Sequence, residues 1–389
     1  AKAHSGIADA YTVLVNHGHE PAAVAHPKAK AAAERALYLD PDLAEAHASL
    51  GIYHLESHHD AARAETELRR AVELNPNYAT AHHWLGLVAN FSGRDAEARA
   101  AMERALELDP LAHILHVAYG EMLLESGAAE QAKAHFLRAR DLDPDYPSVA
   151  AELAWAEMVL WNWCGAEDAL KVGLNHNPNN VDALGAEMHL LMVLGDSDGA
   201  RQALETAERI DPESPGVWMR RALFEHATGN TARAIDWFTR VVEARPEDPF
   251  TAIRLAGCCL QLGQFAEARR WIGVVESGTA GAYAKLRSFR QTLLGQLAAL
   301  EGRAVEVEQS LAVVRADVSN LRRHGNAAFI LTAAGRTDEA LDELELALTV
   351  HDPWLAELPV ERWFGGLRGH PRFQQILEVM GLGSGVPAC

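Results

Sequence analysis

Small and large apolar residues recur along most of this chain with a period of 34 residues. The clearest copy runs from residue 77 to residue 110, and its apolar positions fall in two groups on either side of Gly93. The spacing within each group is that of one face of an α-helix. Each copy therefore predicts a helix–turn–helix hairpin. The positions that carry the pattern in this copy are His82, Leu85, Gly86, Ala89, Ala98, Met102 and Ala105.

A proline that follows Asp, Asn or Arg ends each copy. The residue before a proline is biased away from the helical conformation, so each dipeptide marks the end of a helix. After one interval of 35 residues the prolines follow one another at intervals of 34 residues. They are Pro41, Pro76, Pro110, Pro144, Pro178, Pro212 and Pro246.

Three positions of the copies keep their character. The first helix carries a small residue at Gly51, Gly86, Gly120, Ala154, Met188, Ala222 and Ala256, where Met188 is the exception. The second helix begins with an alanine at 64, 98, 132, 166, 200, 234 and 268, and four residues later carries Leu68, Met102, Phe136, Leu170, Leu204, Phe238 and Ile272. This pattern resembles the tetratricopeptide repeat, a 34-residue helix–turn–helix unit.

The resemblance implies an all-α, right-handed solenoid of about ten hairpins with an irregular C-terminal cap. We expect an atypical N-terminal hairpin at residues 1–41, a regular array at 42–276 and a degenerate hairpin at 277–320. A further repeat at 321–353 and a cap with a tail at 354–389 complete this division, and the apolar side chains of the cap are expected to cover the last repeat. The stretch 276–282 and the tail 384–389 are the expected flexible parts.

Two shorter stretches resemble a narrower group of proteins. Residues 5–11 (SGIADAY) and 367–382 (LRGHPRFQQILEVMGL) are similar to the C-terminal repeat regions of bacterial multidomain signalling proteins. In that group the repeats accompany winged-helix regulators, nucleotide cyclases or protein kinases. The resemblance implies a regulatory module, and no such output domain is visible in this sequence.

The repeat resemblance also implies that the first helix of each hairpin lines a concave groove. By register, the predicted groove residues are His83, Asn90, Val117, Glu121, Trp155, Met158, His189, Met192, Met219 and Leu223. The middle of this set is apolar and rich in methionine, which packs adaptably against varied partners. The same spacing also fits packing between neighbouring hairpins. Co-chaperone members of the superfamily hold a C-terminal carboxylate with lysines that are missing here, so carboxylate-tail docking is disfavoured.

The leading prediction is a non-enzymatic scaffold that binds a protein or peptide in a largely apolar groove. A ligand-sensing or self-associating regulatory module is the alternative, with an apolar small ligand or a homodimer in place of the peptide. An unrecognised metal-dependent enzyme is the third hypothesis. No phosphate-binding loop, nucleophile elbow or dinucleotide fingerprint is present, so we expect no catalytic residue and no cofactor.

Histidine pairs are the one candidate for a metal site. His54 and His58, and His113 and His116, have helical spacing, but no cysteine or carboxylate joins them at a recognised spacing. His47, His82 and His116 occupy one repeat position that carries Trp218 in a later copy. We therefore expect these three to be packing residues, and we expect no metal.

Composition narrows the partners and the compartment. The formal net charge of −19 argues against direct nucleic-acid binding. No apolar stretch is long enough to span a bilayer, and no signal peptide is visible, which favours a cytoplasmic protein. The four cysteines, Cys164, Cys258, Cys259 and Cys389, are expected to be free thiols, as in a reducing compartment.

Overall fold

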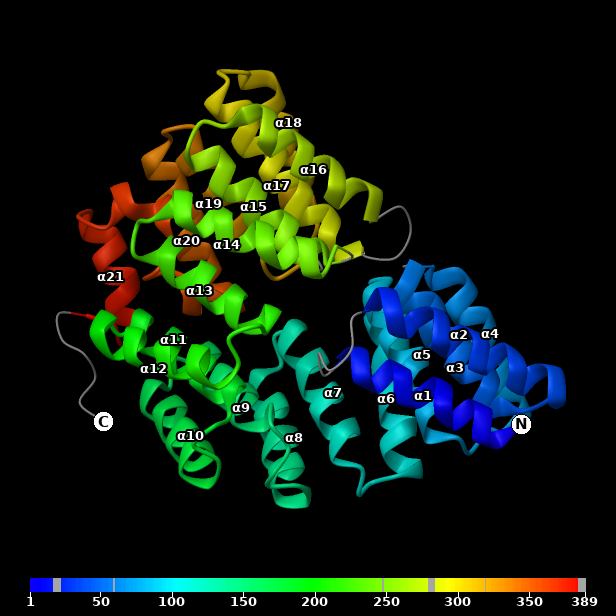
Figure 1. Cartoon of the computed structure of the whole chain (residues 1–389). Coiled ribbons are helices and arrows are strands. Elements are labelled where there is room, and N and C mark those ends of the chain that lie inside the picture. Colours follow the sequence, from blue (N-terminus) through cyan, green and yellow to red (C-terminus); the bar gives the residue numbers. More distant parts are fainter. Residues whose placement is uncertain (17–21, 59, 247, 279–283, 319, 384–389) are drawn as a thin grey trace. The chain divides into compact units, whose positions relative to one another are not determined.

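The computed structural model describes residues 1–16, 22–58, 60–246, 248–278, 284–318 and 320–383. These residues form α-helices and two 3-10 helices and contain no strand (Figure 1). Successive helices pair into ten helix–turn–helix hairpins, so the predicted all-α solenoid is confirmed. Of the stretches expected to be flexible, residues 279–282 and 384–389 lie outside the described residues.

The hairpins follow the chain in order. The first five are α1 (Lys2–Asn16) with α2 (Ala22–Leu39), α3 (Ala44–His58) with α4 (Ala61–Leu74), α5 (Ala79–Phe91) with α6 (Asp95–Leu108), α7 (His113–Glu125) with α8 (Ala129–Leu142), and α9 (Val149–Val159) with α10 (Trp163–His176). The next five are α11 (Val181–Val193) with α12 (Ser197–Ile210), α13 (Pro215–Ala227) with α14 (Thr231–Ala244), α15 (Pro249–Gln261) with α16 (Phe265–Gly278), α17 (Ala284–Leu300) with α18 (Ala304–Ala316), and α19 (Arg323–Ala333) with α20 (Thr337–Thr349). The C-terminal cap consists of η1 (Pro353–Glu357), η2 (Arg362–Leu367) and α21 (Pro371–Val379).

The turn between hairpins explains the Asp-Pro and Asn-Pro dipeptides. The side chain of the Asp or Asn accepts a hydrogen bond from the backbone N–H two residues later, as in Asp143 with Asp145 (3.1 Å) and Asn177 with Asn179 (3.1 Å). Six residues after the proline, a ring N–H donates to the proline carbonyl oxygen. The donors are His47 (3.0 Å), His82 (3.0 Å), His116 (3.1 Å) and Trp218 (2.8 Å). These histidines therefore hold the turn together.

Inside three of the hairpins the two helices approach closely at a glycine of the first helix. A Cβ atom on Gly120 would lie 2.4 Å from Cε1 of the fully buried Phe136, which is closer than two carbon atoms can approach. The same contact pairs Gly51 with Leu68 at 2.7 Å and Gly86 with Met102 at 2.9 Å. The small residues of the pattern are thus required by the packing of the large ones.

From the hairpin of α5 and α6 onward, the turn inside each hairpin contains a residue with positive φ. Glycine supplies it at 34-residue steps at Gly93, Gly127, Gly195, Gly229 and Gly263. Trp161, with φ 58°, takes this place between α9 and α10, and its ring stacks on that of His351, itself at φ 53°, with centroids 4.1 Å apart. Non-glycine residues rarely adopt this conformation, and here two of them are in contact through their side chains.

The chain divides into two compact units. Unit 1 comprises Ala1–Tyr119, Ala244–Glu247 and Glu276–Arg287, and unit 2 comprises Gly120–Glu243, Asp248–Val275 and Ser288–Cys389. In unit 1, Ile52, Leu55 and Leu68 are buried among the alanines of α3 to α5.

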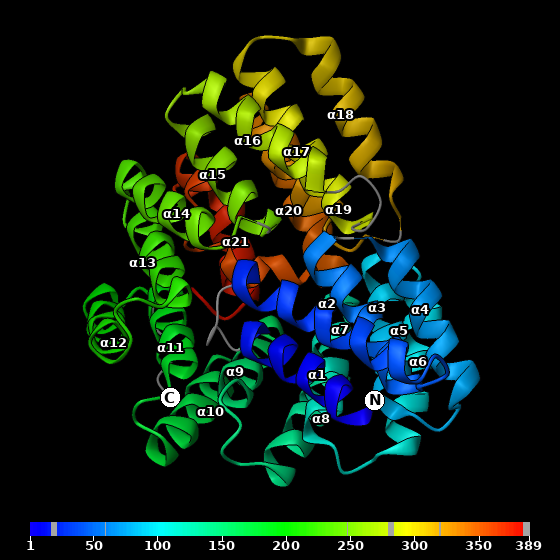
Figure 2. The ribbon, with the colours of Figure 1, turned by 45° about the vertical axis from the view of Figure 1, so that its right-hand side comes forward.

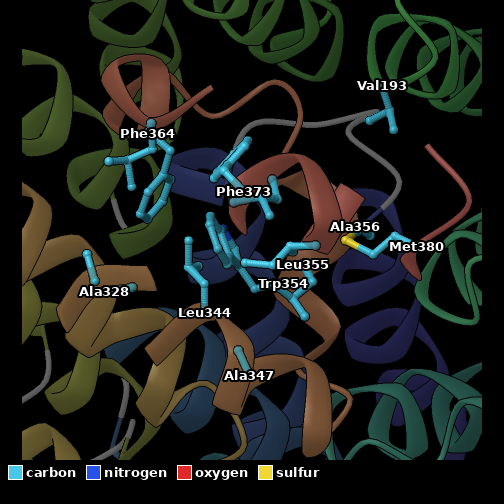
Figure 3. Close-up of a cluster of buried hydrophobic side chains, with 14 of the residues drawn as sticks. Val193, Ala328, Leu344, Ala347, Trp354, Leu355, Ala356, Phe364, Phe373 and Met380 are labelled. Carbon is cyan, nitrogen blue, oxygen red and sulfur yellow. The ribbon is translucent and has the colours of Figure 1, made fainter. Parts of the chain in front are cut away.

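The largest buried cluster of unit 2 is formed around the cap. Figure 3 shows Trp354, Phe364 and Phe373 of the cap gathered with Leu344 of α20, and α21 lies beside α20 in both Figure 1 and Figure 2. The cap covers the last repeat, and its η1 also contacts α9.

A second set of contacts ties the C-terminal end of the chain to α9 and α10. Trp163 Nε1 donates to the carbonyl oxygen of Met380 at 2.7 Å, and His351 Nε2 donates to that of Val159 at 3.1 Å. The cap therefore connects helices that are about two hundred residues apart in sequence.

Two expectations about the compartment can be compared with the structure. None of the helices in the described residues is long and apolar enough to cross a membrane. Cys258 and Cys259 are free and buried, as expected, whereas Cys164 is disulfide-bonded. The expectation of four free thiols was therefore wrong for Cys164, and Cys389 lies outside the described residues.

Candidate binding groove

The inner face of unit 2 contains a cavity of about 450 Å³, which we call the groove cavity. Its walls come from the first helices of successive hairpins, α7, α9, α11, α13 and α15, and from the start of α19 and η1. The side chains that define its chemistry are Glu121, Glu125, Glu152, Trp155, Met158, His189, Arg220, Leu223, Arg254, Arg322 and Glu357.

Five of the ten predicted groove residues line this cavity. They are Glu121, Trp155, Met158, His189 and Leu223. The rings of Trp155 and His189 meet edge to face, with centroids 5.7 Å apart. Met158 is 1 % exposed, so it forms part of the floor and not of the open wall.

The other five predicted residues lie elsewhere. Met192 lines a smaller adjoining cavity of about 30 Å³ together with His189 and Leu223. Met219 is half-buried against the core of α13 to α17. His83, Asn90 and Val117 belong to unit 1 and are buried, and burial lowers the pKa of His83 to about 4.

Two carboxylates dominate one end of the groove cavity. Desolvation, with a contribution from Glu125, raises the pKa of Glu121 to about 7. Desolvation, and then the charge of Glu121, raises the pKa of Glu152 to about 8. Glu121 still reaches water in the open cavity, but protein surrounds it on most sides. Within the described part of the chain neither side chain has a hydrogen bond or an ion pair, and the charge of Arg220 only partly offsets the raised pKa of Glu152, so the neutral forms of both carboxyls are favoured near neutral pH.

Three arginines occupy the other end. Arg254 Nη2 lies 3.3 Å from Glu357 Oε2, and this ion pair raises the pKa of Arg254. The side chain of Arg220 lies over Gly185, where a Cβ atom would come within 2.7 Å of its Nε. Desolvation lowers the pKa of Arg220, and the described residues offer neither Arg220 nor Arg322 an ion-pair partner within 4 Å. The cavity is thus acidic at α7 and α9 and basic at α13, α15 and α19.

Two family models match this repeated architecture. One tetratricopeptide repeat model matches residues 54–105, 91–147 and 186–249, and a second matches residues 225–288. Together the matches cover about half of the chain. The chain belongs to the tetratricopeptide repeat superfamily. No curated protein matches it.

Solved tetratricopeptide repeat structures resemble parts of the chain. PilF of Pseudomonas aeruginosa is 22% identical, with a TM-score of 0.42, over 57% of this chain and 97% of that one. PilW, a type IV pilus biogenesis factor, is 19% identical, with a TM-score of 0.45, over 56% and 97%. YrrB, described as having an unusual peptide-binding site, is 19% identical, with a TM-score of 0.35, over 48% and 95%. The likeness lies in the repeated hairpin.

The sequence register of the tetratricopeptide repeat missed the arginines. Arg220 precedes Leu223 by three residues, so the two lie on the same helix face. From the sequence alone, a charged residue on a helix is normally assigned to the solvent-exposed face. The cavity is therefore more highly charged than the predicted apolar groove.

Metal chemistry has no support in the described residues. No group of three or more His, Cys, Asp or Glu side chains converges there in a way that could hold an ion. His116 uses Nε2 to bond the carbonyl oxygen of Pro110. The side chain of His58, one half of the other pair, lies outside the described residues.

Proposed function

We propose that this tetratricopeptide repeat protein is a scaffold whose groove cavity binds a partner segment carrying a basic side chain beside an apolar one. The observation that supports this most directly is the pair Glu121 and Glu152. Desolvation raises the pKa of both carboxyls and no described side chain is bonded to either, so a lysine or arginine from a partner would stabilise their ionised forms. A charge-assisted hydrogen bond in a desolvated site is stronger than one on an open surface.

The rest of the cavity fits the same segment. Trp155, Met158 and Leu223 offer an apolar surface next to the carboxylates. At the opposite end Arg220 and Arg322 can donate to backbone carbonyl oxygens or to an acidic side chain further along the segment. A segment that carries a basic group, then an apolar group, then a hydrogen-bond acceptor would therefore match the carboxyls, the apolar side chains and the arginines of the cavity.

The sequence resemblance to signalling proteins adds an expectation about context. A scaffold of this kind could serve as the regulatory part of a larger signalling protein, and the basic segment would then belong to its output domain or to an upstream partner. The chemistry proposed for the groove cavity is the same in either case.

A peptide selection tests the proposal. Random peptides displayed on phage and selected on the immobilised protein should be enriched in Lys or Arg next to an apolar residue. For a synthetic peptide from that pool, Glu152→Gln should weaken binding by about tenfold, which corresponds to about 1.4 kcal/mol. The matched control Glu130→Gln removes an exposed carboxylate of α8 that does not line the cavity, and should leave affinity unchanged.

The pH dependence gives a second test of the same contact. A basic side chain binds the ionised carboxylates, whose pKa values are raised, so affinity should increase as the pH rises from 6 to 8.5. Fluorescence anisotropy of the labelled peptide measures both effects. Enriched peptides without basic residues, or equal affinities of the wild type and Glu152→Gln, would show that the carboxylates are not the binding site.

A further inference from the structure

A second cavity of unit 2 has a different chemistry from the groove cavity. It measures about 210 Å³ and is lined by the aromatic rings of Phe250, Phe289, Phe329, Trp354 and Trp363, so we call it the aromatic pocket. Residues of α15, α17 and α19 reach it at the spacing of one helix face, and the two tryptophans of the cap close one side. The Arg254–Glu357 ion pair and Arg322 border both cavities.

Two buried amide nitrogens in the wall have no hydrogen-bond partner among the described residues. Gln296 is 2 % exposed, and its amide nitrogen Nε2 has no hydrogen-bond partner among the described residues. The Nε2 atom of Gln261, also in the wall, is buried and unpartnered in the same way. Arg322 lies with its guanidinium 5.6 Å from the ring centre of Phe289, and no described carboxylate lies within ion-pair distance of it. Buried donors are normally satisfied, so the two amide nitrogens and the guanidinium of Arg322 can donate hydrogen bonds to acceptor atoms of a ligand in the pocket.

The wall also contains unused space. Gly257 is in the middle of α15, where glycine costs a helix about 1 kcal/mol relative to alanine. A Cβ atom on Gly257 would have no other atom within 4 Å. Packing therefore does not require glycine here, unlike Gly51, Gly86 and Gly120, and the open space belongs to the pocket.

We propose that the aromatic pocket binds a small aromatic carboxylate. Its ring would stack among the phenylalanine and tryptophan rings, and its oxygens would accept hydrogen bonds from Gln296, Gln261 and Arg322. An apolar cavity of about 150 Å³ holds benzene, so about 210 Å³ suits a ring that carries one short acidic substituent. Arg322 borders both cavities, but this site does not involve Glu121 or Glu152, the carboxyls proposed to bind the basic segment in the groove cavity.

Two probes of equal size and opposite charge test the proposal on the full chain. Phenylacetate presents acceptors and 2-phenylethylamine presents donors on the same ring, and calorimetry together with the fluorescence of Trp354 and Trp363 reports binding. Phenylacetate should bind saturably, at least tenfold more tightly than 2-phenylethylamine. Absence of saturable binding at millimolar phenylacetate, or equal affinity for the two probes, overturns the proposal.

Three variants locate the site. Gly257→Leu fills the open space and should reduce phenylacetate affinity at least tenfold, while Gly273→Leu, the same change at an uncrowded glycine of α16, should leave it unchanged. Gln296→Met removes an unsatisfied donor, so it should raise the melting temperature of the free protein and weaken phenylacetate binding. Unchanged phenylacetate affinity in folded Gly257→Leu and Gln296→Met would place the binding elsewhere and refute the assignment. Glu152→Gln should not affect phenylacetate, so failure here and failure of the groove proposal are distinguishable.

Discussion

The requirement for glycine in the first helix of a hairpin can be predicted quantitatively from the close approaches. A Gly→Ala change in a helix stabilises it by about 1 kcal/mol when the new methyl group meets nothing. Overpacking a well-packed core costs about 1–3 kcal/mol. The net effect therefore depends on which side chain stands opposite and on whether it can move.

Gly120 and Gly86 are expected to differ for this reason. At Gly120 the added Cβ would lie 2.4 Å from Cε1 and 2.8 Å from Cδ1 and Cζ of Phe136, a rigid ring with no exposed surface. We take the upper end of the overpacking cost there, so Gly120→Ala should destabilise by about 2 kcal/mol net. At Gly86 the opposing atoms are Cγ and Sδ of the flexible Met102, at 2.9 and 3.0 Å. The lower cost offsets the helix gain, and Gly86→Ala should be close to neutral.

Urea unfolding followed by circular dichroism measures the global effect. Hydrogen exchange of the α7 and α8 amides measures the local one, because repeats can unfold in parts. Gly273→Ala is the matched control, since its Cβ would have no other atom within 4 Å, and it should stabilise by about 1 kcal/mol. Phe136→Leu should recover part of the loss in Gly120→Ala. If Gly120→Ala is as stable as the wild type, or if Phe136→Leu gives no recovery, the close approach does not explain the glycine.

Two further predictions concern unit 2. Trp163→Phe removes the donor to the buried carbonyl oxygen of Met380, so it should cost about 1–3 kcal/mol and increase hydrogen exchange in α21, whereas unchanged exchange there would rule out a role for this bond in holding the cap. The raised pKa values of Glu121 and Glu152 mean that the folded chain binds more protons than the unfolded chain between about pH 4.5 and pH 8, so the free energy of unfolding should fall as the pH rises through this window. Denaturation at pH 5.5 and pH 8.5 measures the difference, which Glu152→Gln should reduce; an equal difference in the variant would contradict the assignment.

The hairpins were predictable from the sequence because every signal that defines them is local. The proline dipeptides, the turn glycines and the pairing of Gly120 with Phe136 all lie within one 34-residue copy. The spacing of the copies then fixes the order in which the helices pack. Trp161 shows the limit of this reasoning, because the turn keeps its positive φ with a residue that the pattern does not anticipate.

The candidate site was less predictable because it depends on contacts between distant copies. The register located Glu121, Trp155 and His189, which face inward as members of an apolar helix stripe. It did not locate Arg220 or Arg254, since a single hairpin gives no reason to prefer an inward arginine to a solvated one. Arg254 is paired with Glu357 of the cap, which lies 103 residues later in the sequence, so the reason for its position cannot be found within one hairpin.

The irregular C-terminal segment contributes walls to both cavities of unit 2. The repeats supply a continuous row of first helices, which by itself would form one open surface. The cap places Glu357 against Arg254 and adds Trp354 and Trp363 as walls, so that this surface includes two cavities. One contains Glu121 and Glu152, whose pKa values are raised by desolvation, and the other contains aromatic rings with two unpartnered amide nitrogens. Because both cavities share Arg254, Arg322 and Glu357, the position of the cap determines the chemistry of each.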